Sequence, residues 1–291
     1  MPHETTRVPS SDGVSVALHD LGGTGETLLI SHATGFHGRS YLPVAHELAL
    51  RFHSVALDYR GHGDTSSARS ALGLGNEIGE QLEWERYGDD AEGVALSLER
   101  PLFGFGHSMG GAALLMAAHR NPGLFQRLVL FEPIVFPPMG IRPGGEGDSP
   151  LVAGARRRRT SFPSYDAALS NFSAKPPLSS FTPEALDAYV RFGFAEGEDG
   201  QVHLKCRPET EAATFASSGS HHMWDALPEI STPVLVLAGR VEQMQPSAIS
   251  SSIAELLPNG FYLERADLDH FGPMTHPSEI AQLIAEFLST S

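Results

Sequence analysis

The fold of this chain is decided by Pro101-Leu-Phe-Gly-Phe-Gly-His-Ser-Met-Gly-Gly-Ala-Ala-Leu-Leu-Met-Ala-Ala-His119. Residues 102–105 are short and apolar, which predicts a buried strand, and 111–119 are apolar without a breaker, which predicts a buried helix. Between them lies Gly106-His-Ser-Met-Gly110, a G-x-S-x-G sequence. A serine on such a sharp strand-to-helix turn exposes its hydroxyl above the N-terminus of the helix. We therefore predict that Ser108 is a nucleophile.

On both sides of this turn, strand patterns alternate with helix patterns. Strands are predicted at 14–19, 27–31, 53–58, 128–132, 233–238 and 261–264, and helices at 41–50, 84–99, 246–257 and 277–288. Strands that alternate with helices build a mostly parallel sheet covered on both faces. The predicted fold class is therefore α/β, with a doubly wound sheet.

One region breaks this alternation. Residues 133–150 are rich in proline and glycine, which predicts irregular structure, and only short helices follow, at 165–172, 183–194 and 209–215. We therefore predict that 137–228 is an insertion into a core formed by 1–136 and 229–291. The insertion contains Arg156-Arg-Arg-Arg159. Such a run more often forms the solvent-exposed face of a helix than an anion-binding patch, and we predict an exposed helix face here.

The amino-acid composition limits the classes of partner and the cellular location that can be expected. Twenty basic residues against 35 acidic ones give a net charge of −15, which argues against nucleic acid or an anionic membrane as a partner. Cys206 is the only cysteine, so neither an intrachain disulfide nor a thiolate-rich metal site can form. Residues 1–7 lack the apolar core of a signal peptide, and no apolar run is as long as a membrane span. We expect a cytoplasmic protein.

A serine nucleophile needs a base within hydrogen-bond reach and an acid that orients the base. His270 follows the last predicted strand and precedes the last helix, where this architecture places the base. Two glutamates compete for the acid. Glu242 lies on the loop after 233–238, and Glu132 ends the strand at 128–132. Glu242 is favoured, and Glu132 stays open as the alternative.

Acyl transfer also needs donors for the oxyanion that develops on the substrate. The backbone N–H of Met109, at the start of the serine helix, supplies one donor, and Thr34, on the loop after 27–31, is expected to supply the second. His32 and His37 lie on the same loop without a ligand cluster around them, so we expect them to hold the loop rather than a metal. No metal or cofactor is expected.

With these motifs the chain resembles the α/β-hydrolase superfamily over its whole length. Ser31–Phe36 is similar to the oxyanion loop, Asp58–Thr65 to the Asp-x-Arg-Gly-x-Gly-x-Ser segment, Gly106–Gly111 to the nucleophile elbow, Gly239–Glu242 to Gly-x-x-Asp, and His270–Pro273 to the histidine loop. Two departures are that Ala33 replaces the usual glycine and that Glu242 replaces the usual aspartate. The resemblance implies that 137–228 is a helical lid over the active site.

The serine separates classes within the superfamily. Its dehalogenases and epoxide hydrolases use an aspartate there, whereas Ser108 implies an acyl-enzyme and a Ser-His-Glu triad. We therefore expect hydrolysis of a carboxylic ester, lactone or thioester, with a small, apolar acyl compound as the substrate. The alternatives are a carbon–carbon bond hydrolase or a cofactor-free haloperoxidase or perhydrolase with the same triad. A non-catalytic ligand receptor on this fold is a further alternative.

Overall fold

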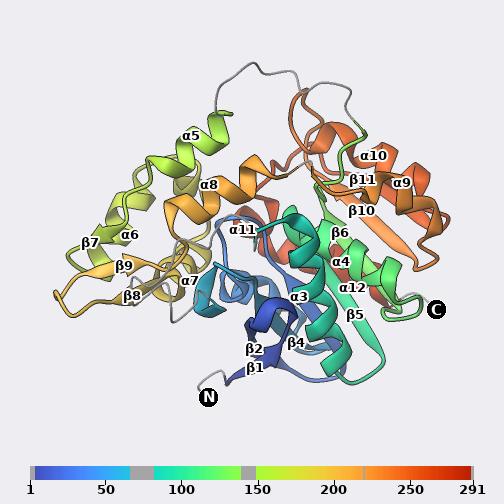
Figure 1. The fold of residues 1–291 in the computed structure, drawn as a ribbon, viewed down its shortest axis with the longest axis horizontal. Coiled ribbons are helices and arrows are strands. Elements are labelled where there is room, and N and C mark those ends of the chain that lie inside the picture. Colours follow the sequence, from blue (N-terminus) through green and yellow to red (C-terminus); the bar gives the residue numbers. More distant parts are fainter. Residues whose placement is uncertain (1–3, 66–81, 139–148, 219, 290–291) are drawn as a thin grey trace.

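The core of the molecule is an eight-stranded sheet, whose arrangement can be followed in Figure 1. The structure is a computed structural model that describes residues 4–65, 82–138, 149–218 and 220–289. The strand order is β1-β2-β4-β3-β5-β6-β10-β11. The strands are β1 (Thr5–Pro9), β2 (Ser15–Gly23), β3 (Glu26–Ser31), β4 (Phe52–Asp58), β5 (Leu102–His107), β6 (Arg127–Phe131), β10 (Val234–Ala238) and β11 (Gly260–Glu264). All neighbours from β4 to β11 pair in parallel, while β1 and β2 are antiparallel. The predicted α/β fold class is confirmed.

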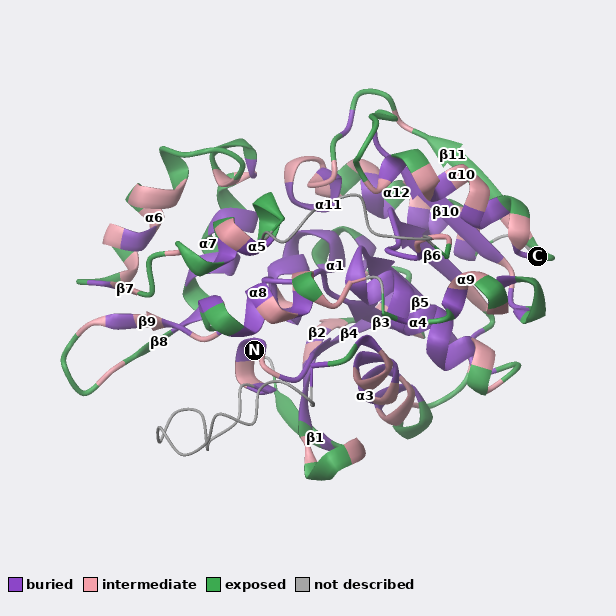
Figure 2. Cartoon of the chain, turned by 45° about the horizontal axis from the view of Figure 1, so that its top comes forward, coloured by how far each residue is buried: buried purple, intermediate pink, exposed green. Residues whose placement is uncertain are grey.

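Helices cover both faces of this sheet. Helices α3 (Trp84–Ser97), α4 (Met109–Arg120) and α10 (Ser247–Leu256) pack on one face, and α1 (Leu42–Leu48) and α12 (Pro277–Leu288) on the other. Successive side chains of a strand point to opposite faces of the sheet, and each face has its own hydrophobic core. Leu29 therefore packs against the first group of helices, and Leu28 and Ile30 pack against the second. Figure 2 shows the buried central strands and the exposed edge strand β11.

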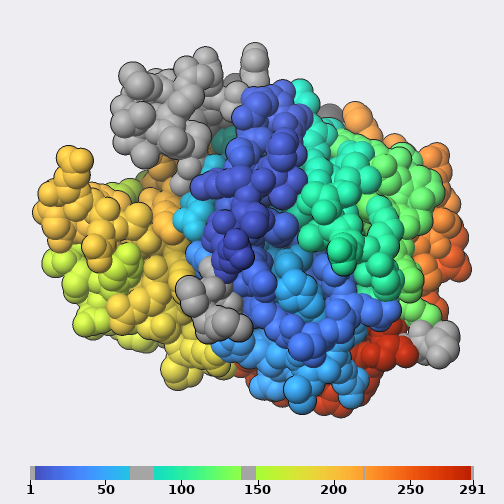
Figure 3. All heavy atoms as spheres, turned by 90° about the horizontal axis from the view of Figure 1, so that it is seen from below, coloured from blue at the N-terminus to red at the C-terminus, as the bar shows by residue number. Residues whose placement is uncertain are grey.

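The segment between β6 and β10 has its own small architecture. It contains α5 (Pro150–Arg156), β7 (Ser161–Phe162), α6 (Tyr165–Ser173), α7 (Pro183–Gly193), β8 (Phe194–Glu196), β9 (Val202–Leu204), α8 (Pro208–Ala216) and α9 (Met223–Ala226). Helices α6, α7 and α8 agree with the helices predicted at 165–172, 183–194 and 209–215, whereas α9 was not predicted. The Thr182 hydroxyl caps α7 by accepting the Ala185 N–H, with Pro183 in the first turn. In the space-filling view its yellow and yellow-green residues gather on one side of the core (Figure 3).

Two features of the β-structure were not predicted. The antiparallel sheet β7-β9-β8 was missed because its strands are two or three residues long, too short to show a periodic pattern. Strand β1 was missed because four of its five residues are exposed at the sheet edge. Of the stretch 133–150, which we predicted to be irregular, residues 139–148 lie outside the described part of the chain.

The remaining elements are short. They are the 3-10 turns η1 (Ser11–Gly13), η2 (Gly38–Tyr41), η3 (Gly63–Thr65), η4 (Leu178–Ser180) and η5 (Leu227–Glu229), and the helix α11 (Gly272–Thr275). Helix α9 packs against α4, so the last part of the predicted insertion lies against the core. Within the described ranges, no helix has both the length and the apolar character needed to cross a membrane.

Candidate active site

Ser108 lies at the apex of the predicted turn, between β5 and α4. Its backbone has φ 55° and ψ −117°, a strained conformation of the kind that clusters at functional sites. The turn is tight enough to require glycine on both sides. A Cβ on Gly106 would lie 2.7 Å from the Cα of Gly111, and one on Gly110 would lie 2.3 Å from the carbonyl oxygen of Ser31. The G-x-S-x-G sequence therefore has a steric cause.

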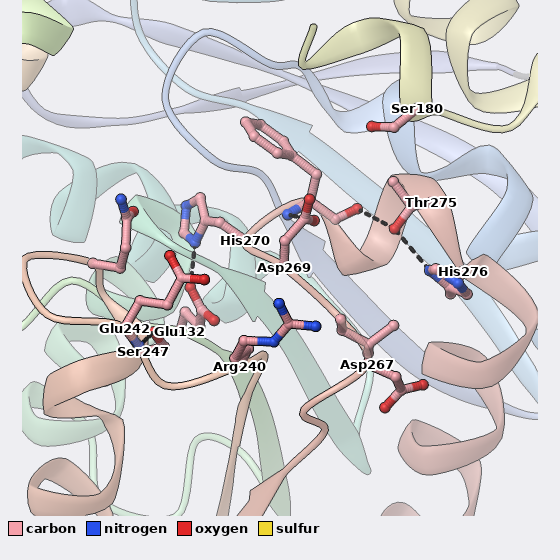
Figure 4. A pocket seen from close by; sticks show the side chains of 13 residues that line it. Glu132, Ser180, Arg240, Glu242, Ser247, Asp267, Asp269, His270, Thr275 and His276 are labelled. Carbon is pink, nitrogen blue, oxygen red and sulfur yellow. Dashed lines mark hydrogen bonds and ion pairs between the residues drawn. The ribbon is translucent and has the colours of Figure 1, made fainter.

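His270 and Glu132 meet at the carboxyl end of the sheet (Figure 4). The Nδ1–H of His270 donates to Oε2 of Glu132 over 2.5 Å. The other carboxylate oxygen, Oε1, accepts the backbone N–H of Gly239 over 2.8 Å. Glu132 is 1% exposed and directly follows β6, so its carboxylate is buried and fixed at both oxygens. Such a carboxylate can hold the imidazole in one tautomer and stabilise its cation.

The structure places Glu132, and not the favoured Glu242, in hydrogen-bond contact with His270. Glu242 is exposed on the turn after β10, where its backbone N–H donates to the Ser247 hydroxyl over 3.2 Å. Within the described part of the chain, no hydrogen bond joins it to His270. The physical reason is that Glu132 already occupies the Nδ1 side of the imidazole, at the end of a strand that lies between β5 and β10.

A backbone hydrogen bond places Ser108 next to the end of β6, where Glu132 lies. Its N–H donates to the carbonyl of Phe131, the residue before Glu132, over 2.9 Å. Among the described residues no hydrogen bond joins the Ser108 hydroxyl to His270. In free enzymes such bonds are often long and shorten only when the substrate binds.

His107, which precedes the serine, connects the elbow to the histidine loop. Its Nε2 lies 2.9 Å from the carbonyl oxygen of His270, and because a carbonyl can only accept, this nitrogen carries the proton. Its Nδ1 then accepts from the Tyr41 hydroxyl over 2.8 Å, and that hydroxyl accepts the N–H of Ala33 over 3.1 Å. Burial and the neighbouring His270 hold the pKa of His107 well below its ordinary value. Sequence reasoning missed this network, for which the position beside Ser108 was the only signal.

The two predicted oxyanion donors lie against each other. Met109 begins α4, and its sulfur is 3.4 Å from the Thr34 hydroxyl. Both residues are buried, in surroundings of low dielectric constant, where hydrogen bonds to a developing charge are strong.

His32 and His37 hold the oxyanion loop from within the protein. The Nδ1–H of His32 donates to the carbonyl of Ala33 over 2.8 Å, and its Nε2 accepts the N–H of Tyr59 over 3.0 Å. His37 donates to the carbonyl of Tyr189 over 3.1 Å, which ties the loop to α7. Burial lowers the pKa of His32 to about 3 and that of His37 to about 4, so both are neutral at pH 7.

A group of potential metal ligands, His19, Asp58 and Asp64, lies elsewhere among the described residues. Protein cations already compensate its charge, since Lys205 and Arg39 both contact the Asp64 carboxylate. Asp58 is likewise saturated by His19 and by backbone N–H groups. The arrangement fits a buried ion-pair network.

A groove of about 610 Å³ opens beside the histidine. Its lining includes Glu132, Glu242, Arg240, Asp269 and His270, as Figure 4 shows. The groove thus reaches the side chains of Glu132 and His270, and its other lining groups are mainly polar.

The family described as "Serine aminopeptidase, S33" (Hydrolase_4) matches residues 22–260. The chain therefore belongs to this family within the α/β-hydrolase superfamily, and it is a hydrolase. The predicted superfamily is confirmed.

Characterised relatives are distant but cover most of the chain. The pimeloyl-[acyl-carrier protein] methyl ester esterase of Methylococcus capsulatus is 26% identical over 276 residues, covering 94% of this chain and 98% of the relative. The 2-(acetamidomethylene)succinate hydrolase of Mesorhizobium japonicum is 22% identical over 272 residues, covering 91% and 89%. A crystal structure of E-2-(acetamidomethylene)succinate hydrolase has a TM-score of 0.76 at 19% identity and covers 99% of this chain and 100% of its own.

Proposed function

We propose that the protein is a carboxylic ester hydrolase that works through an acyl-enzyme, with Ser108, His270 and Glu132 as its catalytic triad. The observation that carries this proposal is the hydrogen bond between His270 Nδ1 and the buried Glu132 carboxylate, beside a serine on a strained elbow. A serine, an imidazole and a carboxylate in these positions are the parts that acyl transfer requires.

The reaction follows from these roles. The Ser108 oxygen attacks the ester carbonyl while its proton passes to Nε2 of His270. The oxyanion accepts hydrogen bonds from the N–H groups of Met109 and Thr34, and the intermediate collapses as His270 protonates the leaving alcohol. Water then gives a proton to His270 and attacks the acyl carbon. The acid leaves, and Ser108 recovers its proton.

We further propose that 137–228 acts as a lid on the core formed by 1–136 and 229–291. In support, Phe36 of the oxyanion loop packs against Phe181 and Tyr189 of the inserted segment, with ring centroids 6.1 and 5.3 Å apart. This aromatic cluster lies near the serine elbow, because Phe36 also lies 6.4 Å from the ring of His107, the residue before Ser108. We propose a small acyl compound as the substrate class.

The relatives support the ester-cleaving assignment, since one of them is named as a methyl ester esterase. The same triad also serves carbon–carbon bond hydrolases and perhydrolases, and a non-catalytic receptor could retain it. No feature of the described residues favours these over ester hydrolysis.

The proposal is tested with p-nitrophenyl esters from acetate to long-chain acyl groups. We expect turnover by the wild type, none by Ser108→Ala, and stoichiometric labelling of Ser108 by a fluorophosphonate. The acyl length that gives the highest kcat/KM measures the size of the acyl pocket. Full activity in a purified Ser108→Ala variant would refute the mechanism, and a wild type inert toward all esters would favour the other classes.

A further inference from the structure

One arginine of the run 156–159, Arg158, does not lie on a solvent-exposed helix face as predicted. Helix α5 ends at Arg156, and the side chain of Arg158 turns inward and is only 18% exposed, whereas the other three arginines are exposed. The prediction for the run is therefore wrong at this position. A guanidinium that is so far removed from water needs partners.

The partners of Arg158 come from two other helices of the inserted segment. Its Nη1 donates to the Glu211 carboxylate on α8, and its Nη2 donates to the Tyr189 hydroxyl on α7. A guanidinium has five N–H donors in a rigid fork, and these bonds use two of them. Within the described residues no other hydrogen bond from this guanidinium is present, so donors remain for a ligand.

This group lies directly above the oxyanion loop. A Cβ on Gly35 would be 2.6 Å from Oε1 of Glu211 and 3.4 Å from Nη1 of Arg158. Because Gly35 follows Thr34, and adjacent Cα atoms are 3.8 Å apart, Nη1 lies within about 9 Å of the Thr34 Cα. A group bound to Arg158 would therefore be a few bonds away from a carbonyl held at the Thr34 N–H.

A second buried group nearby is also incompletely paired. His62 is fully buried, and its Nδ1 donates to the carbonyl of Arg60 over 3.1 Å. Its Nε2 has no partner among the described residues. Burial lowers the pKa of His62, and the charges of Glu211 and Arg158 are close enough to affect it. Because Nδ1 carries the proton, Nε2 can only accept, and buried polar atoms are normally satisfied. This nitrogen therefore indicates a place for a hydrogen-bond donor, such as a water or a ligand hydroxyl, and not for a carboxylate.

From this geometry we propose that Arg158 is a specificity-determining residue that binds a carboxylate on the acyl part of the substrate, a few carbon atoms from the reacting carbonyl. The location of that carbonyl rests on the proposed function, but the anion site can be tested without turnover. Arginine binds carboxylates through parallel hydrogen bonds. A fixed cation is needed here because the net charge of −15 repels anions.

Glu211 provides a second test with the opposite sign, because its negative charge offsets part of the charge of Arg158. If a substrate carboxylate shares the guanidinium with Glu211, the two carboxylates repel each other. Glu211→Gln should then strengthen anion binding, while Arg158→Gln weakens it. Loss of a structural ion pair would instead damage the site in both variants.

The binding test uses Ser108→Ala protein and calorimetric titration with succinate, glutarate and adipate. We expect saturable binding of at least one of these dianions, weakened about 10-fold or more by Arg158→Gln and strengthened by Glu211→Gln. Arg158→Lys should retain part of the affinity, and Arg157→Gln, which changes an exposed neighbour, should leave it unchanged. Because a folding defect cannot tighten binding, the Glu211 variant keeps the test informative. Absence of binding to the whole series, or binding that does not depend on Arg158, would overturn the proposal.

A kinetic test separates this inference from the proposed function. We expect the wild type to prefer mono-p-nitrophenyl glutarate to p-nitrophenyl valerate, and Arg158→Gln to lower the ratio of the two kcat/KM values about 10-fold or more. If Arg158→Gln affects both esters alike, the anion site is refuted while the esterase assignment survives. If neither ester is cleaved but glutarate binding depends on Arg158, the anion site is supported and the esterase assignment fails.

Discussion

Replacing Glu132 by glutamine probes the triad without changing the size of the side chain. The Gly239 N–H lies 2.8 Å from Oε1, so the amide of the variant must present its oxygen to this donor. Its NH₂ group then faces Nδ1 of His270, which must become an acceptor. The imidazole proton is thereby forced onto Nε2, the nitrogen that has to accept the proton of Ser108. In a serine protease the analogous change lowers kcat by about 10⁴-fold, and we expect a loss of that order here.

The assay is hydrolysis of p-nitrophenyl acetate, with Glu242→Gln as the matched control. Glu242 lines the same groove as His270 but is exposed and makes no hydrogen bond to it, so its variant should retain activity within about twofold, because exposed rim charges contribute little. Thermal unfolding of both variants checks that the fold is intact. The reasoning is refuted if Glu132→Gln keeps more than a tenth of the activity, or if Glu242→Gln is damaged equally.

Three further predictions concern the elbow and the buried network around it. Tyr41→Phe removes a hydroxyl that links two partners, and it should cost about 1–3 kcal/mol of unfolding free energy in urea and lower kcat more than it changes KM. Gly110→Ala places a Cβ 2.3 Å from a backbone oxygen and should abolish soluble, active protein, whereas Gly154→Ala, with open space around it, should unfold at the same or a higher temperature. The neutral, buried His37 has a pKa lowered to about 4, so the unfolded chain binds the extra proton first as the pH falls. The unfolding free energy should therefore decline between about pH 6.5 and pH 4, by roughly 3 kcal/mol from this group, and urea titrations at several pH values that showed no decline would contradict this reasoning.

Much of the fold could be predicted because the signals are local. The strand–turn–helix around Ser108 depends on neighbouring glycines and on an apolar run that the sequence displays directly. The long buried elements were predicted for the same reason. Short or exposed strands such as β1 and β7 carry no such pattern, because their pairing depends on partners that are distant in the sequence.

The residues of the candidate site likewise fall into those that the sequence predicts from a local motif and those that only the tertiary structure brings together. By itself the sequence determined the α/β architecture, the serine elbow and the loop that carries His270, since each is encoded in a contiguous motif. It left the choice between Glu132 and Glu242 open because both follow strands that end at the same edge of the sheet. Only the tertiary structure decided which carboxylate meets the imidazole, by placing β6 between β5 and β10. It also decided that Arg158 turns inward, because its partner Glu211 lies 53 residues away in the chain and approaches only when α5 and α8 pack against each other.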